Sequence, residues 1–88
     1  MAAPVMEETL GERIRIERAR KQIRQAALAK AIGISANSMN QIESGESDPR
    51  ASRIAALARV LGVSADYLLG LCEERTPRED PRHAGHAV

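Results

Sequence analysis

The near absence of aromatic side chains is the feature of this sequence that most restricts its fold. Phe and Trp are missing from the 88 residues, and Tyr67 is the only aromatic residue. Hydrophobic residues still make up 43% of the chain, so a core must be assembled from Ile, Leu, Val, Met and Ala. Ala and Leu favour helices, whereas strands are enriched in aromatic and β-branched residues. The sequence therefore predicts one small domain of close-packed helices.

Apolar residues at helical spacing, separated by capping residues and glycines, predict five helices and no strand. The predicted helices lie between residues 10 and 21, 25 and 32, 35 and 45, 49 and 62, and 64 and 70. Thr9 with Glu12 three residues later forms a capping box at the first helix, and Gly33 suits the left-handed residue that ends the second. Periodicity alone would also allow one long helix over residues 10–32; we place a break near Gln22 and Ile23. The predicted fold class is all-α.

The chain divides into three parts by composition. Residues 1–9 lack periodicity and form a flexible lead, residues 10–71 form the domain, and residues 72–88, with two prolines and mixed charges, form a disordered tail. No apolar run approaches the ~20 residues of a membrane span, and the N-terminus does not resemble a signal peptide. We expect a cytoplasmic protein without a membrane partner.

The net charge of +1 conceals an uneven distribution. Residues 10–41 contain seven Lys and Arg against two Glu, a net charge of +5, and the rest of the chain carries −4. A basic segment of this kind is where a nucleic-acid interface would lie, although an Arg-rich solvated helix face is an equal alternative on charge alone.

Residues 24–43 read as a helix, a short turn containing glycine, and a second helix. This arrangement lets the second helix enter the major groove of DNA while the first lies across the backbone. Met39 and Ile42 would anchor the second helix, leaving short uncharged side chains on its outward side. Asn and Gln can pair with adenine N6 and N7, so this side could read bases. The outward residues are Ala36, Asn37, Asn40, Gln41 and Ser44.

With these residues in place, Leu10–Leu71 resembles the Cro/CI-type helix-turn-helix domain of phage repressors and their bacterial relatives, a compact five-helix, lambda-repressor-like fold. The resemblance rests on residues in order and at family spacing over about sixty positions. They include Leu10-Gly11, Ile14, Arg18, Gln25, Leu28-Ala29, Gly33-Ile34-Ser35, Met39, Ile42-Glu43, Gly45, Pro49, Leu57-Ala58, Leu61-Gly62-Val63-Ser64 and Leu68.

The resemblance implies roles for individual side chains. Gln25 matches a residue whose side chain and backbone N–H contact a phosphate, and Arg24 could add a second phosphate contact. Arg18 and Glu43 match a structural ion pair between the first and third helices. The base-reading positions correspond to Ala36, Asn37 and Gln41, and the flanking positions to Ser35, Asn40 and Ser44.

The sequence also departs from the family pattern. Gln22 stands where the family usually has Gly, and Arg24 stands where it usually has a capping Ser. Glu17 occupies a position that is usually apolar, while Ile16 is apolar where exposure is normal. The loop Glu46-Ser47-Asp48, often basic in the family, would repel phosphates here.

Other chemistry has little support in the sequence. One cysteine, Cys72, excludes an intramolecular disulfide and a Cys-rich zinc site. His83 and His86 lack further ligands at metal-binding spacing. No nucleophile–base set or glycine-rich phosphate loop occurs, so we expect no catalysis, no cofactor and no metal.

The predicted function is a sequence-specific transcriptional regulator, a repressor that binds double-stranded DNA at a palindromic operator as a homodimer. The predicted dimer surface consists of Val63, Leu68, Leu69 and Leu71, some of which must fill the core. The alternative is an interaction module, either an antitoxin or an adaptor, whose residues 72–88 become ordered on a protein partner.

Overall fold

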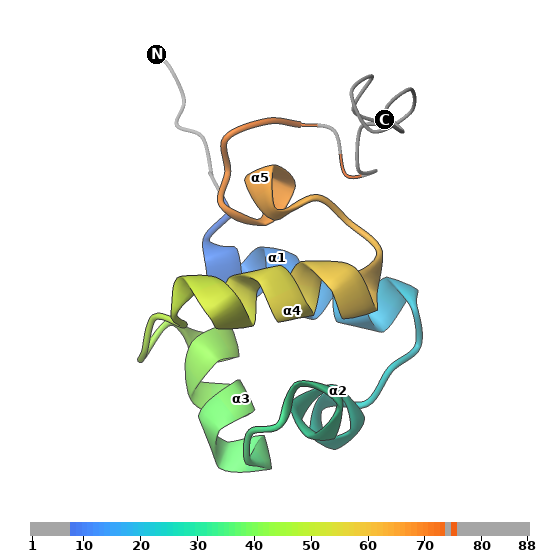
Figure 1. Cartoon of the computed structure of the whole chain (residues 1–88), viewed down its shortest axis with the longest axis vertical. Coiled ribbons are helices and arrows are strands. Elements are labelled where there is room, and N and C mark those ends of the chain that lie inside the picture. The colour runs from blue at the N-terminus through green and yellow to red at the C-terminus, as the bar shows by residue number, and fades with distance from the viewer. Residues whose placement is uncertain (1–7, 74, 76–88) are drawn as a thin grey trace, which may run out of the picture.

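The computed structural model describes residues 8–73 and residue 75, which form five α-helices. These are α1 (Leu10–Arg20), α2 (Gln25–Ile32), α3 (Ala36–Ser44), α4 (Ala51–Leu61) and α5 (Ala65–Leu68). No strand occurs among the described residues, which confirms the all-α prediction. Helix α4 packs against α1, with α5 on one side of this pair and α2 and α3 on the other (Figure 1).

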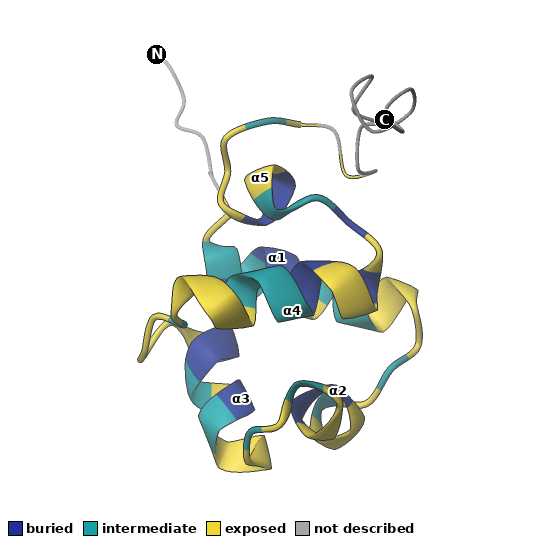
Figure 2. Cartoon of the chain, in the orientation of Figure 1, coloured by how far each residue is buried: buried dark blue, intermediate teal, exposed yellow. Residues whose placement is uncertain are grey.

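The core is aliphatic, as the composition predicts, and every helix contributes to it. The buried surfaces of the helices face one another, and the exposed surfaces lie on the outside of the bundle (Figure 2). The single aromatic residue, Tyr67, is also buried. Fully buried apolar side chains are Ile14 from α1, Leu28 from α2, Met39 from α3, Leu57 and Leu61 from α4, and Leu68 from α5.

The predicted helix ends are confirmed where capping geometry can be checked. Thr9 N–H donates to Glu12 Oε1 at 3.0 Å and Glu12 N–H donates to Thr9 Oγ1 at 3.1 Å, which completes the capping box. Ser35 and Ser64 accept backbone N–H bonds at the starts of α3 and α5. Each cap satisfies one of the backbone donors that a helix N-terminus leaves without a partner.

The chain breaks after α1, so the prediction of a break is confirmed and the alternative of one long helix is wrong. Helix α1 ends at Arg20, and Gln22 has φ 58°, the one non-glycine residue in the described chain with a positive φ. Ile23 N–H donates to Arg18 O at 3.0 Å across the turn. Gln22 therefore adopts the left-handed conformation for which the family pattern uses glycine, at a steric cost of roughly 1 kcal/mol.

We expect Gln22→Gly to raise the stability of the domain. Relief of the left-handed strain outweighs the added entropy of glycine in the unfolded chain, for a net gain of about 0.5 kcal/mol and a Tm increase of a few degrees. Lys21→Gly, at the neighbouring residue with φ −88°, is the matched control and should lower the Tm. Thermal unfolding followed by circular dichroism measures both, and a decrease for Gln22→Gly would contradict the prediction.

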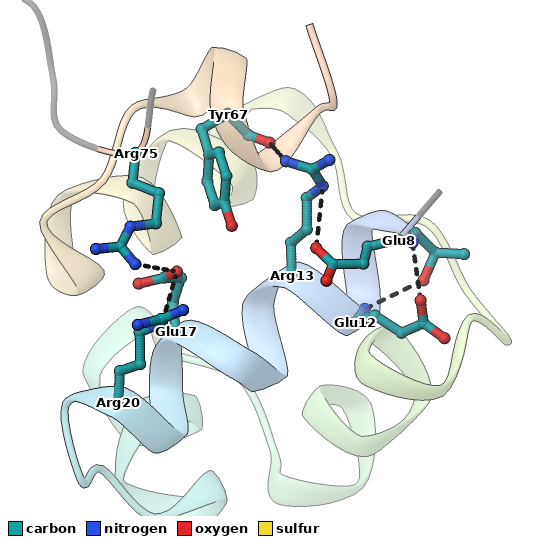
Figure 3. Close-up of polar contacts among 8 residues, drawn as sticks. Glu8, Glu12, Arg13, Glu17, Arg20, Tyr67 and Arg75 are labelled. Atoms are coloured by element: carbon teal, nitrogen blue, oxygen red, sulfur yellow. Dashed lines mark hydrogen bonds and ion pairs between the residues drawn. The ribbon is translucent and has the colours of Figure 1, made fainter. Parts of the chain in front are cut away.

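Helix α1 also buries a cation, Arg13. Its guanidinium lies 4.6 Å from the centre of the Tyr67 ring, and Nη1 donates to Tyr67 O at 3.1 Å (Figure 3). Its Nε lies 3.8 Å from Glu8 Oε1. The aromatic face and the carbonyl replace part of the water that the cation loses, so Arg13 ties α1 to α5.

A buried anion, Glu17, lies further along α1. Its Oε2 is 3.4 Å from Arg20 Nε and 3.7 Å from Arg75 Nη1, the two cations that neutralise it in Figure 3. Arg75 O also accepts a hydrogen bond from Ser64 N–H at 2.8 Å. Arg75 thus contacts both α1 and the start of α5.

None of the helices described by the structure is long and apolar enough to cross a membrane.

Candidate nucleic-acid interface

Helices α2 and α3 form a compact pair joined by the three-residue turn Gly33-Ile34-Ser35. Gly33 has φ 79°, and Ile34 N–H donates to Ala29 O at 2.9 Å. Ala29 is almost fully buried, and its small side chain permits α2 to pack closely against α3. The turn is thus built by glycine in the left-handed region and by a small residue at the helix crossing.

The outward side of α3 is polar and uncharged. Met39, Ile42 and Glu43 are buried beneath the helix. Of the residues expected on the outward side, Gln41 is half-buried and the others are exposed: Ala36, Asn37, Asn40 and Ser44. Ser35, at the N-cap of α3, is also exposed. The helix therefore presents amide and hydroxyl groups able to donate and accept hydrogen bonds.

The N-terminus of α2 is open because its N-cap residue is an arginine. Arg24 has the extended conformation of an N-cap, φ −75° and ψ 152°, yet its side chain makes no capping hydrogen bond. Its side chain is exposed. Backbone N–H groups at a helix start attract anions, and the guanidinium adds a full positive charge next to them. This end of α2 is suited to a phosphate.

A partly buried ion pair joins α1 to the end of α3, at the residues expected. Arg18 Nε donates to Glu43 Oε2 at 2.7 Å and Arg18 Nη2 donates to Glu43 Oε1 at 3.1 Å. Arg18 Nη1 also donates to Ile23 O at 3.0 Å, in the turn before α2. One guanidinium therefore connects α1 to the end of α3 and to the turn that leads into α2, and it binds the carboxylate in the bidentate geometry that arginine favours.

The structure adds a contact that the sequence analysis did not predict. Gln25 Nε2 donates to Glu43 Oε1 at 3.1 Å and to Asn40 Oδ1 at 3.4 Å. The side chain expected to contact phosphate is thus directed toward α3, and its backbone N–H remains the group suited to phosphate. The sequence alone does not distinguish a Gln25 side chain that contacts phosphate from one that bonds to α3, because either role places a Gln at the start of α2.

The basic segment contributes less surface charge than its total of +5 suggests. Arg13 is buried, and Arg18 is partly buried against Glu43. The exposed cations of the segment are Arg15, Arg20, Lys21, Arg24 and Lys30. The acidic loop Glu46-Ser47-Asp48 after α3 is exposed as well.

Burial separates the four residues of the predicted dimer surface into two groups. Val63 and Leu68 lie in the core, so they cannot meet a partner. Leu69 and Leu71 are 47% and 72% exposed, and Val60 on α4 is 39% exposed. The exposed large aliphatic residues of the described chain are thus Val60, Leu69 and Leu71.

The C-terminal segment begins at Cys72. Cys72 packs against the core, with its Sγ 4.0 Å from Ser64 Oγ. His83 and His86, with most of the tail to which a protein-partner role was assigned, lie outside the described residues.

Comparison with known protein families identifies the same arrangement. The helix-turn-helix domain family matches residues 9–69 of this chain. Repressor protein C2 of Salmonella phage P22 is 44% identical over 62 residues, which cover 70% of this chain and 29% of the repressor. The HTH-type transcriptional regulator DicA of Escherichia coli (strain K12) is 41% identical over 69 residues, which cover 78% of this chain and 51% of DicA. The chain therefore spans about a third to a half of the length of these curated relatives.

Solved structures show the same fold. The P22 c2 repressor in complex with synthetic operator 9T superimposes with a TM-score of 0.70 and 42% sequence identity. The match covers 74% of this chain and 98% of that one.

Proposed function

We propose, from the premise that this chain belongs to the Cro/CI-type helix-turn-helix family, that it is a sequence-specific DNA-binding transcriptional repressor acting on DNA in the cytoplasm. The observation that carries the proposal is the exposed, uncharged amide face of α3. This helix follows α2, whose N-terminus has no side-chain cap. A helix with this face fits the major groove, where amides distinguish base pairs. The relative with a solved operator complex supports the same use of this fold.

We assign base contacts and phosphate contacts to two different sets of groups. Ala36, Asn37 and Gln41 meet base edges, with Ser35, Asn40 and Ser44 beside them. Ala36 offers only a methyl group, which suits the C5-methyl of thymine. Arg24 and the backbone N–H groups at the start of α2 bind phosphate, which fixes the position of α3 without selecting sequence.

A homodimer on a palindromic operator would supply the specificity that one domain lacks. Two recognition helices about 34 Å apart meet successive major grooves on one side of the duplex. The exposed aliphatic side chains of Val60, Leu69 and Leu71 are the contact surface that we assign to this dimer. Sedimentation of the protein with its selected DNA should show two copies per site, and Leu71→Asp should leave a half-site complex.

Selection of bound sequences from a random DNA pool tests the function directly. A repressor of this kind should enrich one short motif in two inverted copies, and its affinity should fall steeply as salt rises because phosphate contacts release counterions. Binding without sequence enrichment, or an affinity independent of salt, would refute the proposal.

We expect Arg24→Ser to separate stability from DNA binding. Serine is a good N-cap in the extended conformation that Arg24 already has, so the variant should gain about 1 kcal/mol of folding free energy. It also loses a phosphate-binding cation, so its affinity should fall to a similar extent for all DNA sequences, with a smaller salt slope. Arg59→Ser, at an exposed position on α4 outside the candidate interface, is the control. Tm and filter-binding measurements give both values; a selective loss for particular base pairs would contradict the assigned role.

A further inference from the structure

A chain of hydrogen bonds runs from the interior of the domain to the exposed side of α3. It begins at Arg18 on α1, passes through Glu43 and Gln25, and ends at Asn40. Gln25 contributes the connecting step, with its Nε2 at 3.1 Å from Glu43 Oε1 and at 3.4 Å from Asn40 Oδ1. Asn40 itself is exposed.

The direction of these hydrogen bonds is set from the buried end. A guanidinium can only donate and a carboxylate can only accept, so the Arg18–Glu43 pair presents an acceptor to Gln25. The Gln25 amide must therefore turn its Nε2 toward Glu43, because its own oxygen would be repelled there. The second hydrogen of the same NH₂ group is then available for Asn40, which must offer its Oδ1 in return.

This polarity determines how Asn40 faces DNA. An asparagine that reads adenine uses both ends of its amide, with the oxygen accepting from N6 and the nitrogen donating to N7. Here Oδ1 accepts from Gln25 Nε2, which occupies one of its two lone pairs and favours an orientation that offers the two hydrogens of Nδ2 to the ligand. Guanine presents two acceptors, O6 and N7, in the major groove, whereas adenine presents one acceptor and one donor.

We propose that Gln25 is a positioning residue that orients Asn40 to donate to the base, so that Asn40 selects guanine rather than adenine at the base pair it meets. The inference rests on the proposed function and gives it a chemical preference at one base pair. Asn40 makes the base contact, and Gln25 acts through it.

Base preference in selected DNA tests this inference. Asn40→Ala first identifies the base pair concerned, as the one whose preference disappears. The parent protein should prefer guanine there, by roughly tenfold over adenine, as one good amide contact allows. Gln25→Met keeps the length of the side chain but removes both hydrogen bonds, and the preference for guanine over adenine should fall several-fold. Arg24→Ala is the matched control at the adjacent residue, with weaker binding and an unchanged preference.

A second substitution keeps the inference testable should Gln25→Met alter the packing. Asn40→Asp retains an oxygen that accepts from Gln25 but removes the Nδ2 donors, so guanine should be replaced by cytosine, whose N4 donates. Three results would overturn the inference while DNA binding stands. The parent could prefer adenine at the Asn40 base pair, or Asn40→Ala could lose no base preference. Gln25→Met and Asn40→Asp could also both leave the preference for guanine unchanged. Failure of the parent to select any sequence would instead refute the proposed function, and the inference with it.

Discussion

Replacing Gly11 with alanine is expected to destabilise the domain by about 2–3 kcal/mol, the usual cost of forcing extra volume into a packed site. Gly11 lies in the first turn of α1, where that helix meets the C-terminal half of α3. A Cβ at this position would lie 2.4 Å from Ile42 O and 2.5 Å from Glu43 O. Both atoms belong to the backbone of α3, so the clash can be relieved only by separating the helices.

The expected sign follows from a comparison of two effects. Alanine gains up to about 1 kcal/mol over glycine from helix propensity, which alone would stabilise α1. The backbone clash is larger, and it also shifts α3, whose outward face carries the candidate base-reading residues. Thermal unfolding should therefore show a Tm lower by roughly 10 °C.

Ala19→Gly, at an exposed position of the same helix, isolates the propensity effect and should cost about 1 kcal/mol. If Gly11→Ala and Ala19→Gly both lower the stability of the domain, helix propensity cannot explain the effect at Gly11, and the contact with α3 must cause it. A Gly11→Ala variant as stable as the parent would refute the close approach of the helices.

The sequence could predict this fold because its local signals agree with one another. Thr9, Gly33 and Ser35 each fix a helix end through hydrogen bonds to near neighbours, so their effect can be read without knowing the tertiary structure. The aliphatic positions repeat at helical spacing, which identifies the buried face of each helix. The exposed face of α3 follows from the same periodicity.

The remaining features depend on residues far apart in the chain. Glu17 is buried with Arg75, which returns to α1, as well as with its near neighbour Arg20, and Arg13 is accommodated by Tyr67, 54 positions away. The contact of Gln25 with Asn40 needs the angle between α2 and α3, which periodicity does not determine. Side chains with two possible hydrogen-bonding roles are therefore the least predictable part of the candidate site.

The Arg18–Glu43 pair provides the second large effect. Arg18→Met should destabilise the domain by roughly 3–5 kcal/mol, because it leaves the Glu43 carboxylate buried without a cation. The carboxylate side chain is only 4% exposed, whereas that of Arg18 is 17% exposed. This cost is a large part of the 5–15 kcal/mol by which a domain of this kind is usually stable.

The two partners should not be equivalent. In Glu43→Gln the arginine keeps its hydrogen bond to Ile23 O, retains a carbonyl acceptor, and reaches water more easily than the carboxylate does. We expect this variant to lose about 1–3 kcal/mol, less than Arg18→Met.

Urea unfolding of the two single variants and of Arg18→Met/Glu43→Leu measures the asymmetry through midpoints at constant m-value. The double variant should be more stable than Arg18→Met alone, because it removes the uncompensated charge and fills the same space with apolar atoms. Arg15→Met, at an exposed position of α1, is the matched control and should change stability by no more than about 0.5 kcal/mol.

If Arg18→Met behaved like Arg15→Met, the pair would not secure α3 against α1. If the double variant were instead less stable than Arg18→Met, the expectation would be contradicted. The hydrogen bond from Gln25 to Glu43, which Arg18→Met keeps and the double variant loses, would then outweigh the unpaired charge.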